Sequence, residues 1–256
     1  MLIDLHAYSH HTGGAPLADL VAQAKSQGLD GLCVADRGAS AESARAVAAG
    51  EFGDFPVFVG VELQTRQGDV LVLSRDIDPF MTREEWRQLT ALERPELDAV
   101  VALMEAEGGV TLLAHPYDRA RKPSPGDRLF AMEGLAGLEV GTGSSESRAN
   151  RTAIEAVTRS QLPGFGGSAM RRGDGKPTWL TLFGEPIATQ AELVAALASG
   201  DMWPVCVGGS APRNERRRSD RGERRGGDRG ERRGGDRGER RGGGRRGGGR
   251  RRGGRA

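Results

Sequence analysis

Short apolar runs alternate with helical patterns along the first 210 residues of the chain. Leu2 to His6 and Leu32 to Asp36 are typical of buried strands. Between them, the apolar positions 17, 20, 21 and 24 recur at helical spacing, after Pro16 and before Gly28. The beginning of the chain therefore predicts a strand, a helix and a second strand.

The same alternation continues to residue 207. The pattern predicts helices at 40–49, 146–160 and 189–198, and a helical segment at 82–107 with a break at Pro95. It predicts strands at 56–62, 69–74, 110–115, 137–140, 162–168, 179–183 and 205–207, with the second of these paired to the first. Strands that alternate with helices over this length predict an α/β fold whose parallel sheet closes as a barrel.

The charge changes sign near residue 211. The last 44 residues hold 19 arginines against seven acids, a net charge of +12, so the whole-chain charge of +2 leaves −10 on the preceding 212 residues. From Ser219 the chain repeats Asp-Arg-Gly-Glu-Arg-Arg-Gly-Gly and has no aliphatic or aromatic residue before Ala256. We therefore expect a barrel domain at 1–210 and a disordered tail at 211–256.

The tail is similar to the Arg-Gly-Gly segments of RNA-binding proteins. Guanidinium groups contact phosphates and stack on bases, so the tail predicts contact with RNA or another polyanion. The alternatives are a solubilising appendage and a nonspecific electrostatic tether, which could also fold back on the acidic body. Cys33 and Cys206 have no metal-like spacing and no apolar run reaches membrane-spanning length, which favours a cytoplasmic protein without membrane contact.

Polar residues recur where the predicted strands end. His6, Asp36, Glu62, His115 and Glu139 each lie at the C-terminal end of a predicted buried strand. Enzymes with parallel barrels build their sites at this end. The pattern therefore predicts one site that gathers these side chains.

Five motifs together resemble the PHP family, named for polymerase and histidinol phosphatase. They are Asp4-Leu-His6, Val34-Ala-Asp36, the stretch from Gly60 to Asp69, Leu113-Ala-His115-Pro and Gly167-Ser168. The resemblance covers roughly residues 1 to 185 and is closest to stand-alone members that hydrolyse phosphate esters or remove nucleotides from the 5′ end of short nucleic acids. It implies a distorted seven-stranded (β/α) barrel with two or three zinc, manganese or iron ions, which activate water and neutralise phosphoryl charge.

The resemblance carries over to some metal ligands and fails at others. His6, Asp36, Glu62 and His115 match ligand positions of the family. Four further ligand positions are lost, since they hold Tyr8, Arg37, Ala169 and Arg171, and Gly13 stands where an aspartate is usual.

The remaining ligands are too few for a secure ion. The first ion keeps His6 and Glu62 and the second keeps Glu62 and His115, whereas a catalytic site normally has three protein ligands. Replacement ligands stay open: they are His10, His11, Tyr8, Asp69 and Asp118. The alternatives are surface histidines, a structural tyrosine and turn aspartates, and for Glu139 a hydrogen-bond anchor.

Arginines at lost positions suggest a different use of the pocket. Arg37, Arg171 and Arg172 could bind a phosphorylated small molecule or nucleotide, with fixed positive charge in place of an ion. The alternative is that Arg37 pairs with Asp36 or Glu62. The sequence thus favours a phosphate-binding and RNA-binding module impaired in metal-dependent hydrolysis, with no catalytic residue assigned and with a divalent metal or none. An active phosphoesterase or 5′–3′ exonuclease with a reduced metal site is the alternative.

Overall fold

The computed structural model describes residues 1–38, 41–143, 145, 147–170 and 178–207. Contacts divide the chain into Met1–Ala211 and Pro212–Ala256. The predicted phosphate ligands Arg171 and Arg172 and the predicted tail at 211–256 lie outside the described residues. All of the described residues belong to the first unit.

The strands of this unit pair in one sheet in the order β7-β6-β5-β4-β3-β2-β1-β8-β9. Their bounds are β1 Leu2–Ala7, β2 Gly31–Arg37, β3 Val57–Gln64, β4 Asp69–Leu73, β5 Val110–Leu113, β6 Gly137–Thr142, β7 Gly164–Gly167, β8 Trp179–Phe183 and β9 Met202–Cys206.

The sheet is mixed rather than wholly parallel. Strands β1, β2 and β3 are parallel, as are β5, β6 and β7. Strand β4 runs antiparallel to β3 and β5, and β8 runs antiparallel to β1 and β9. The expectation of a parallel sheet was therefore wrong at β4 and at β8. The connection to β4 at 65–68 allows a hairpin and is too short for a parallel crossover, and β8 runs antiparallel to β1.

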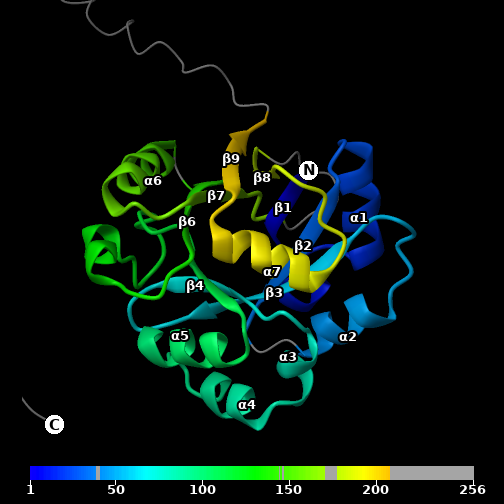
Figure 1. The fold of residues 1–256 in the computed structure, drawn as a ribbon, viewed down its shortest axis with the longest axis horizontal. Coiled ribbons are helices and arrows are strands. Elements are labelled where there is room, and N and C mark those ends of the chain that lie inside the picture. Colours follow the sequence, from blue (N-terminus) through cyan, green and yellow to red (C-terminus); the bar gives the residue numbers. More distant parts are fainter. Residues whose placement is uncertain (39–40, 144, 146, 171–177, 208–256) are drawn as a thin grey trace, which may run out of the picture. The chain divides into compact units, whose positions relative to one another are not determined.

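The sheet curls into a nearly closed barrel (Figure 1). The hydroxyl of Thr181 in β8 accepts a hydrogen bond of 3.0 Å from the backbone nitrogen of Gly166 in β7 and donates one of 2.7 Å to its carbonyl oxygen. Gly167 lies so close to β1 that a Cβ there would be 2.4 Å from the Cβ of His6. The expected distorted α/β barrel is confirmed, with nine strands in the described residues where the resemblance implies seven.

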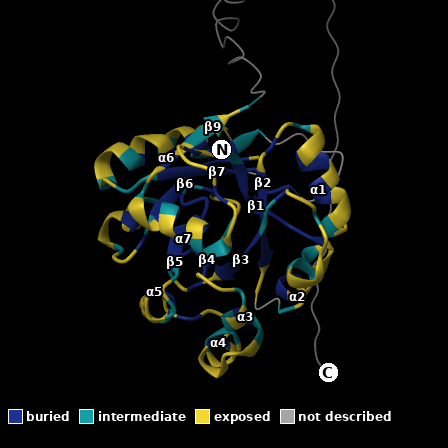
Figure 2. Cartoon of the chain, turned by 45° about the vertical axis from the view of Figure 1, so that its right-hand side comes forward, coloured by how far each residue is buried: buried dark blue, intermediate teal, exposed yellow. Residues whose placement is uncertain are grey.

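Seven helices in the described residues pack against the barrel, and all but α7 lie around its outside (Figure 2). They are α1 Leu17–Ser26, α2 Ala41–Ala49, α3 Asp78–Thr82, α4 Glu84–Thr90, α5 Leu97–Ala106, α6 Ser147–Ser160 and α7 Gln190–Ser199, with short 3₁₀ turns η1 His10–Thr12 and η2 Gly126–Ala131. Helices α4 and α5 lie on either side of the predicted break at Pro95. No helix in the described ranges is long and apolar enough to cross a membrane.

Helix α7 plugs the barrel at the N-terminal ends of the parallel strands. Its residues Leu193 and Leu197 belong to the same buried cluster as Ile3 of β1 and Leu112 of β5. The side chain of Gln190 bonds to the backbone nitrogen and oxygen of Val59, at 3.0 and 2.7 Å. With this end packed, the opposite end is left for polar side chains.

Candidate functional site

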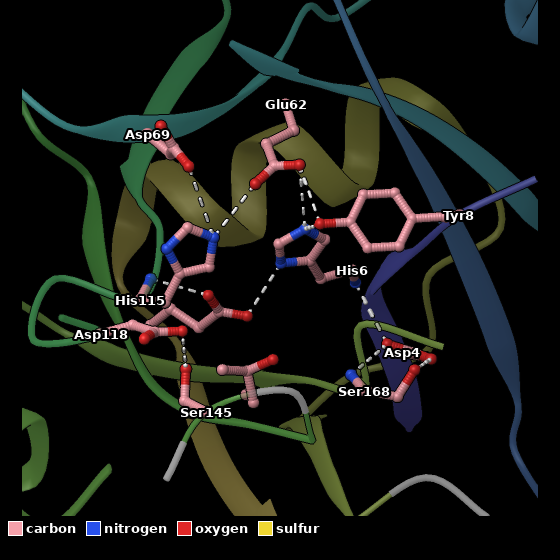
Figure 3. Close-up of polar contacts among 12 residues, drawn as sticks. Asp4, His6, Tyr8, Glu62, Asp69, His115, Asp118, Ser145 and Ser168 are labelled. Atoms are coloured by element: carbon pink, nitrogen blue, oxygen red, sulfur yellow. Dashed lines mark hydrogen bonds and ion pairs between the residues drawn. The ribbon is translucent and has the colours of Figure 1, made fainter. Parts of the chain in front are cut away.

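Glu62 lies at the centre of a polar cluster at the open end of the barrel (Figure 3). Its Oε1 is 3.0 Å from Nε2 of His115 and 3.7 Å from Nη1 of Arg121. Its Oε2 accepts hydrogen bonds from the hydroxyl of Tyr8 at 2.8 Å and from Nε of Arg37 at 2.7 Å. Burial alone would raise the pKa of Glu62, but the hydrogen bond with His115 and the surrounding positive charge bring this pKa well below its usual range. Glu62 is therefore a buried anion.

His6 is fully buried and uses both ring nitrogens. Nδ1 lies 2.9 Å from Oε1 of Glu139, and Nε2 lies 2.9 Å from the hydroxyl of Tyr8. Because Tyr8 gives its single proton to Glu62, both nitrogens of His6 must donate, and the ring is an imidazolium. Burial alone would lower the pKa of His6, but the hydroxyl of Tyr8 and the carboxylate of Glu139 raise this pKa well above its usual value.

The hydroxyl of Tyr8 occupies the space between two residues that the sequence predicts as ligands of one ion. Nε2 of His6 and Oε2 of Glu62 are 4.0 Å apart, and the hydroxyl bonds to both. Burial raises the pKa of Tyr8, so the phenol keeps its proton. The side chain is held as a neutral hydrogen-bonding group in the core.

Glu139 holds both histidines of the cluster in place. Its Oε1 faces Nδ1 of His6, and its Oε2 accepts a hydrogen bond from the backbone nitrogen of His115 at 2.8 Å. His115 has a φ of 27°, a backbone conformation that is strained for any residue other than glycine. Glu139 therefore acts as the hydrogen-bond anchor that its place in the sequence suggested.

Asp4 ties β1 to the segment after β7. Its Oδ1 accepts hydrogen bonds from the backbone nitrogens of His6 at 3.1 Å and Ser168 at 2.9 Å, and its Oδ2 accepts one from the hydroxyl of Ser168. Burial raises the pKa of Asp4 above its usual value, although these hydrogen bonds oppose the effect. The first and last motifs of the resemblance are thus joined through this carboxylate.

One group of side chains fits a divalent ion. Ligand atoms of Glu62, Asp69 and His115 all lie within 4.8 Å of one another, and all three residues are buried. Nε2 of His115 is 3.9 Å from Oδ2 of Asp69, and the other oxygen of Asp69 is buried without a hydrogen-bond partner. An imidazole and two carboxylates form a donor set that suits zinc, manganese or iron.

Asp36 lies with hydroxyl groups rather than with this cluster. Its carboxylate accepts hydrogen bonds from the backbone nitrogen of Ser9 at 2.8 Å and from the hydroxyls of Ser9, Thr12 and Ser43. It makes no hydrogen bond or ion pair with Glu62 among the described residues. The structure therefore places it as an anchor for the loop after β1.

The other candidate ligands fall into three classes. His10 and His11 are exposed on η1, with ring centroids 3.9 Å apart. Asp118 stabilises a turn, since it accepts hydrogen bonds from the nitrogen of Ala120 and the hydroxyl of Ser145, both at 3.0 Å. Of the replacement ligands considered from the sequence, Asp69 is the one that lies within the group that could hold an ion.

Basic residues line the mouth of the site, and the sequence predicted only some of them. A pocket of about 420 Å³ is lined by the basic residues Arg37, Arg121 and Lys122, with Asp69 and Asp118 among its other residues. Arg37 pairs with Glu62, which confirms the alternative interpretation of this residue, and its binding of phosphate stays a prediction. Arg121 and Lys122 were missed, because no pattern marks a loop residue that returns to the site.

No family model matches the sequence, and no curated protein does. Several solved structures are similar. A two-domain protein from Bacteroides vulgatus that contains a predicted PHP-like metal-dependent phosphoesterase has 14% identity and a TM-score of 0.56, over 80% of this chain and 64% of that one. This chain thus spans less than two thirds of that protein.

Two further structures are similar over most of their own lengths. A putative metal-dependent phosphoesterase from Bifidobacterium adolescentis has 19% identity and a TM-score of 0.52, over 76% of this chain and 96% of that one. An amidohydrolase from Chromobacterium violaceum, with bound sulfate and no metal, has 20% identity and a TM-score of 0.51, over 68% and 89%. At these identities the likeness concerns the fold, and the chain has the PHP-type barrel found in metal-dependent phosphoesterases.

Proposed function

We propose that this protein binds phosphate esters at the mouth of its barrel, holds at most one divalent ion, and does not carry out hydrolysis that needs two or three ions. The observation that carries the proposal is the position of the Tyr8 hydroxyl, 2.9 Å from Nε2 of His6 and 2.8 Å from Oε2 of Glu62. The resemblance assigns these two residues to the first ion. They are satisfied here by a hydroxyl group.

The proposal of phosphate binding rests on the basic mouth. Nε of Arg37 is bonded to Glu62, and its guanidinium, whose side chain is 45% exposed, has further donors that match phosphate oxygens. Arg121 and Lys122 line the same pocket. The similar amidohydrolase contains bound sulfate, which shares tetrahedral geometry and negative charge with phosphate.

A second candidate function is favoured by the buried oxygen of Asp69 that has no partner. An ion bound by Glu62, Asp69 and His115 would leave positions open, as a catalytic site requires. It would supply charge neutralisation at the phosphoryl oxygens. The chain would then be a phosphoesterase or a 5′–3′ exonuclease with a single-ion site.

Elemental analysis of protein purified without chelator separates these functions. We expect at most about one divalent ion per chain, removed in Asp69→Asn and retained in the exposed control Asp54→Asn. Wild type should release phosphate from a nucleoside monophosphate no faster than His115→Ala does. Two or more ions per chain, with hydrolysis that His115→Ala abolishes, would overturn the proposal in favour of the metal-dependent enzyme.

Calorimetric titration with a nucleoside monophosphate tests the basic mouth. Affinity should fall about tenfold in Lys122→Ser and further in Arg37→Ser/Arg121→Ser, because each loses a charge-assisted hydrogen bond. Arg45 and Arg151 are exposed and lie outside this pocket, so Arg45→Ser/Arg151→Ser is the matched control. Equal affinity in all variants would exclude the mouth as the binding site.

We also propose that the Arg-Gly tail contacts RNA. The support is its composition, with six arginines and no acid after residue 244. Replacing these six arginines by serine in the full chain should weaken binding of a long single-stranded RNA and make its dependence on salt shallower. Unchanged or tighter RNA binding would instead favour contact of the tail with the acidic body.

A further inference from the structure

A second pocket adjoins the one at the barrel mouth. It has a volume of about 560 Å³ and lies between the loop at 117–127 and the first turns of α6. Asp118 and Ala120 line both pockets, so one short piece of chain forms their common wall. A volume of this size accommodates a group as large as a nucleotide.

The second pocket holds two arginines without acidic partners. Arg119 and Arg148 line it, and neither guanidinium makes an ion pair or a hydrogen bond among the described residues. Two acids also line the pocket and have other partners: Asp118 faces Ser145 and Arg121, and Asp127 accepts a hydrogen bond from the hydroxyl of Tyr117 at 2.8 Å.

Such an arrangement favours an anion. Two guanidinium groups without an acidic partner among the described residues give their side of the pocket a positive potential, although Asp118 and Asp127 also line the pocket and the first 212 residues carry a net charge of −10. The 14-residue helix α6 adds to it, because Arg148 and Ala149 lie in its first turn, where the helix dipole is positive.

We propose that this pocket, which we call the Arg119 pocket, is a second anion subsite that binds the next phosphate of a single-stranded nucleic acid. The inference rests on the proposed function, since the terminal phosphate of the same strand is placed between Arg37 and Arg121. Adjoining pockets suit a ligand with regularly repeated phosphates. The ring of Tyr117, which lines the Arg119 pocket, offers a surface on which a base can stack.

The test compares a 5′-phosphorylated RNA tetranucleotide with a nucleoside monophosphate, both titrated calorimetrically into the full chain. Arg119→Ser/Arg148→Ser should weaken tetranucleotide binding about tenfold and leave monophosphate binding unchanged. The plot of log affinity against log salt should become shallower by about 0.7 for each phosphate that the variant no longer neutralises. Arg45→Ser/Arg151→Ser removes the same charge outside the pocket, and the tail is identical in every variant.

Each outcome bears on one hypothesis. If the monophosphate binds but the tetranucleotide binds equally well to both double variants, the Arg119 pocket is not a subsite and the proposed function stands. If the monophosphate does not bind while Arg119→Ser/Arg148→Ser still weakens the tetranucleotide selectively, the mouth proposal fails and the subsite stands. Tyr117→Leu gives a second readout, because removal of the stacking surface should weaken binding of the tetranucleotide alone.

Discussion

The hydroxyl of Tyr8 donates a hydrogen bond of 2.8 Å to Oε2 of Glu62, deep inside the open end of the barrel. This one contact determines the chemistry of the cluster. It directs the proton of Tyr8 away from His6, so His6 must donate to the phenol oxygen and cannot offer a lone pair there. A neutral phenol thereby links the imidazolium of His6 to the carboxylate of Glu62.

Removal of this hydroxyl should destabilise the fold. Tyr8→Phe leaves the Nε2–H of His6 and one oxygen of Glu62 short of a partner in a buried place, which costs about 2 kcal/mol of unfolding free energy. Urea denaturation measures the change. Tyr117→Phe is the control, since its phenol is bonded at the surface to Asp127 and its loss should cost less than about 1 kcal/mol. Equal losses would contradict the buried hydrogen-bond arrangement.

Replacement of Glu139 by glutamine should lower the unfolding free energy. Its two oxygens face two donors, Nδ1 of His6 and the backbone nitrogen of His115. A glutamine at this position would turn its amide group toward one of them, so Glu139→Gln should lose about 2 kcal/mol in chemical denaturation. Glu133→Gln, on the surface, should change the unfolding free energy by less than about 0.5 kcal/mol. A wild-type midpoint for Glu139→Gln would rule out its role as a double acceptor.

The sequence predicted the barrel because strands and helices alternate along the chain, and hydrophobic periodicity records that alternation. It did not predict the direction of β8, since direction depends on tertiary packing. It also did not predict that α7 plugs one end of the barrel. The periodicity of residues 189–198 indicates an apolar face but not the surface that the face meets.

Prediction of the site was limited in a similar way. His6, Glu62 and His115 converge as their motifs indicated, although their role in metal binding stays a prediction. Asp69 looked like a turn residue, yet its carbonyl oxygen accepts a hydrogen bond of 2.9 Å from the nitrogen of Ala114, which brings its side chain beside His115. Pairing between distant strands places such a residue, and no local pattern records it.

Helix α7 should lose stability in acid through its capping box. Thr189 accepts a hydrogen bond from the nitrogen of Glu192, whose carboxylate accepts hydrogen bonds from the nitrogens of Ala188 and Thr189. These bonds lower the pKa of Glu192 below 4.5. A lowered pKa means that the stabilisation is present above pH 4.5 and disappears as the pH falls through the folded-state pKa.

Thermal unfolding of wild type and Glu192→Gln between pH 3 and pH 7 tests this dependence. The two proteins should differ in Tm at pH 7, and the difference should shrink as the pH falls below 4.5 toward the folded-state pKa of Glu192. Thr189→Ala should cost about 1 kcal/mol of unfolding free energy at neutral pH, as the loss of a helix cap does. A difference between wild type and Glu192→Gln that stays constant over this range would show that the charge of Glu192 contributes nothing.

Gly167 should prove essential because it allows β7 to approach β1. A Cβ at this position would lie 2.4 Å from the Cβ of His6 and 3.1 Å from Oε1 of Glu139, and neither neighbour can move without breaking the hydrogen bond between them. Gly167→Ala should therefore cost about 1 to 3 kcal/mol of unfolding free energy. It should also weaken monophosphate binding, because displacement of His6 disturbs Tyr8 and through it Glu62.

Gly184→Ala provides the control for this overpacking. A Cβ there would meet its nearest neighbour, a carboxylate oxygen of Asp201, at 3.6 Å, which is ordinary contact. Its unfolding free energy should stay within about 0.5 kcal/mol of wild type. Gly167→Ala could instead match this control in both unfolding free energy and phosphate affinity. The contact between β7 and His6 would then have room for a Cβ, and the close approach of β7 to β1 would not be what positions His6.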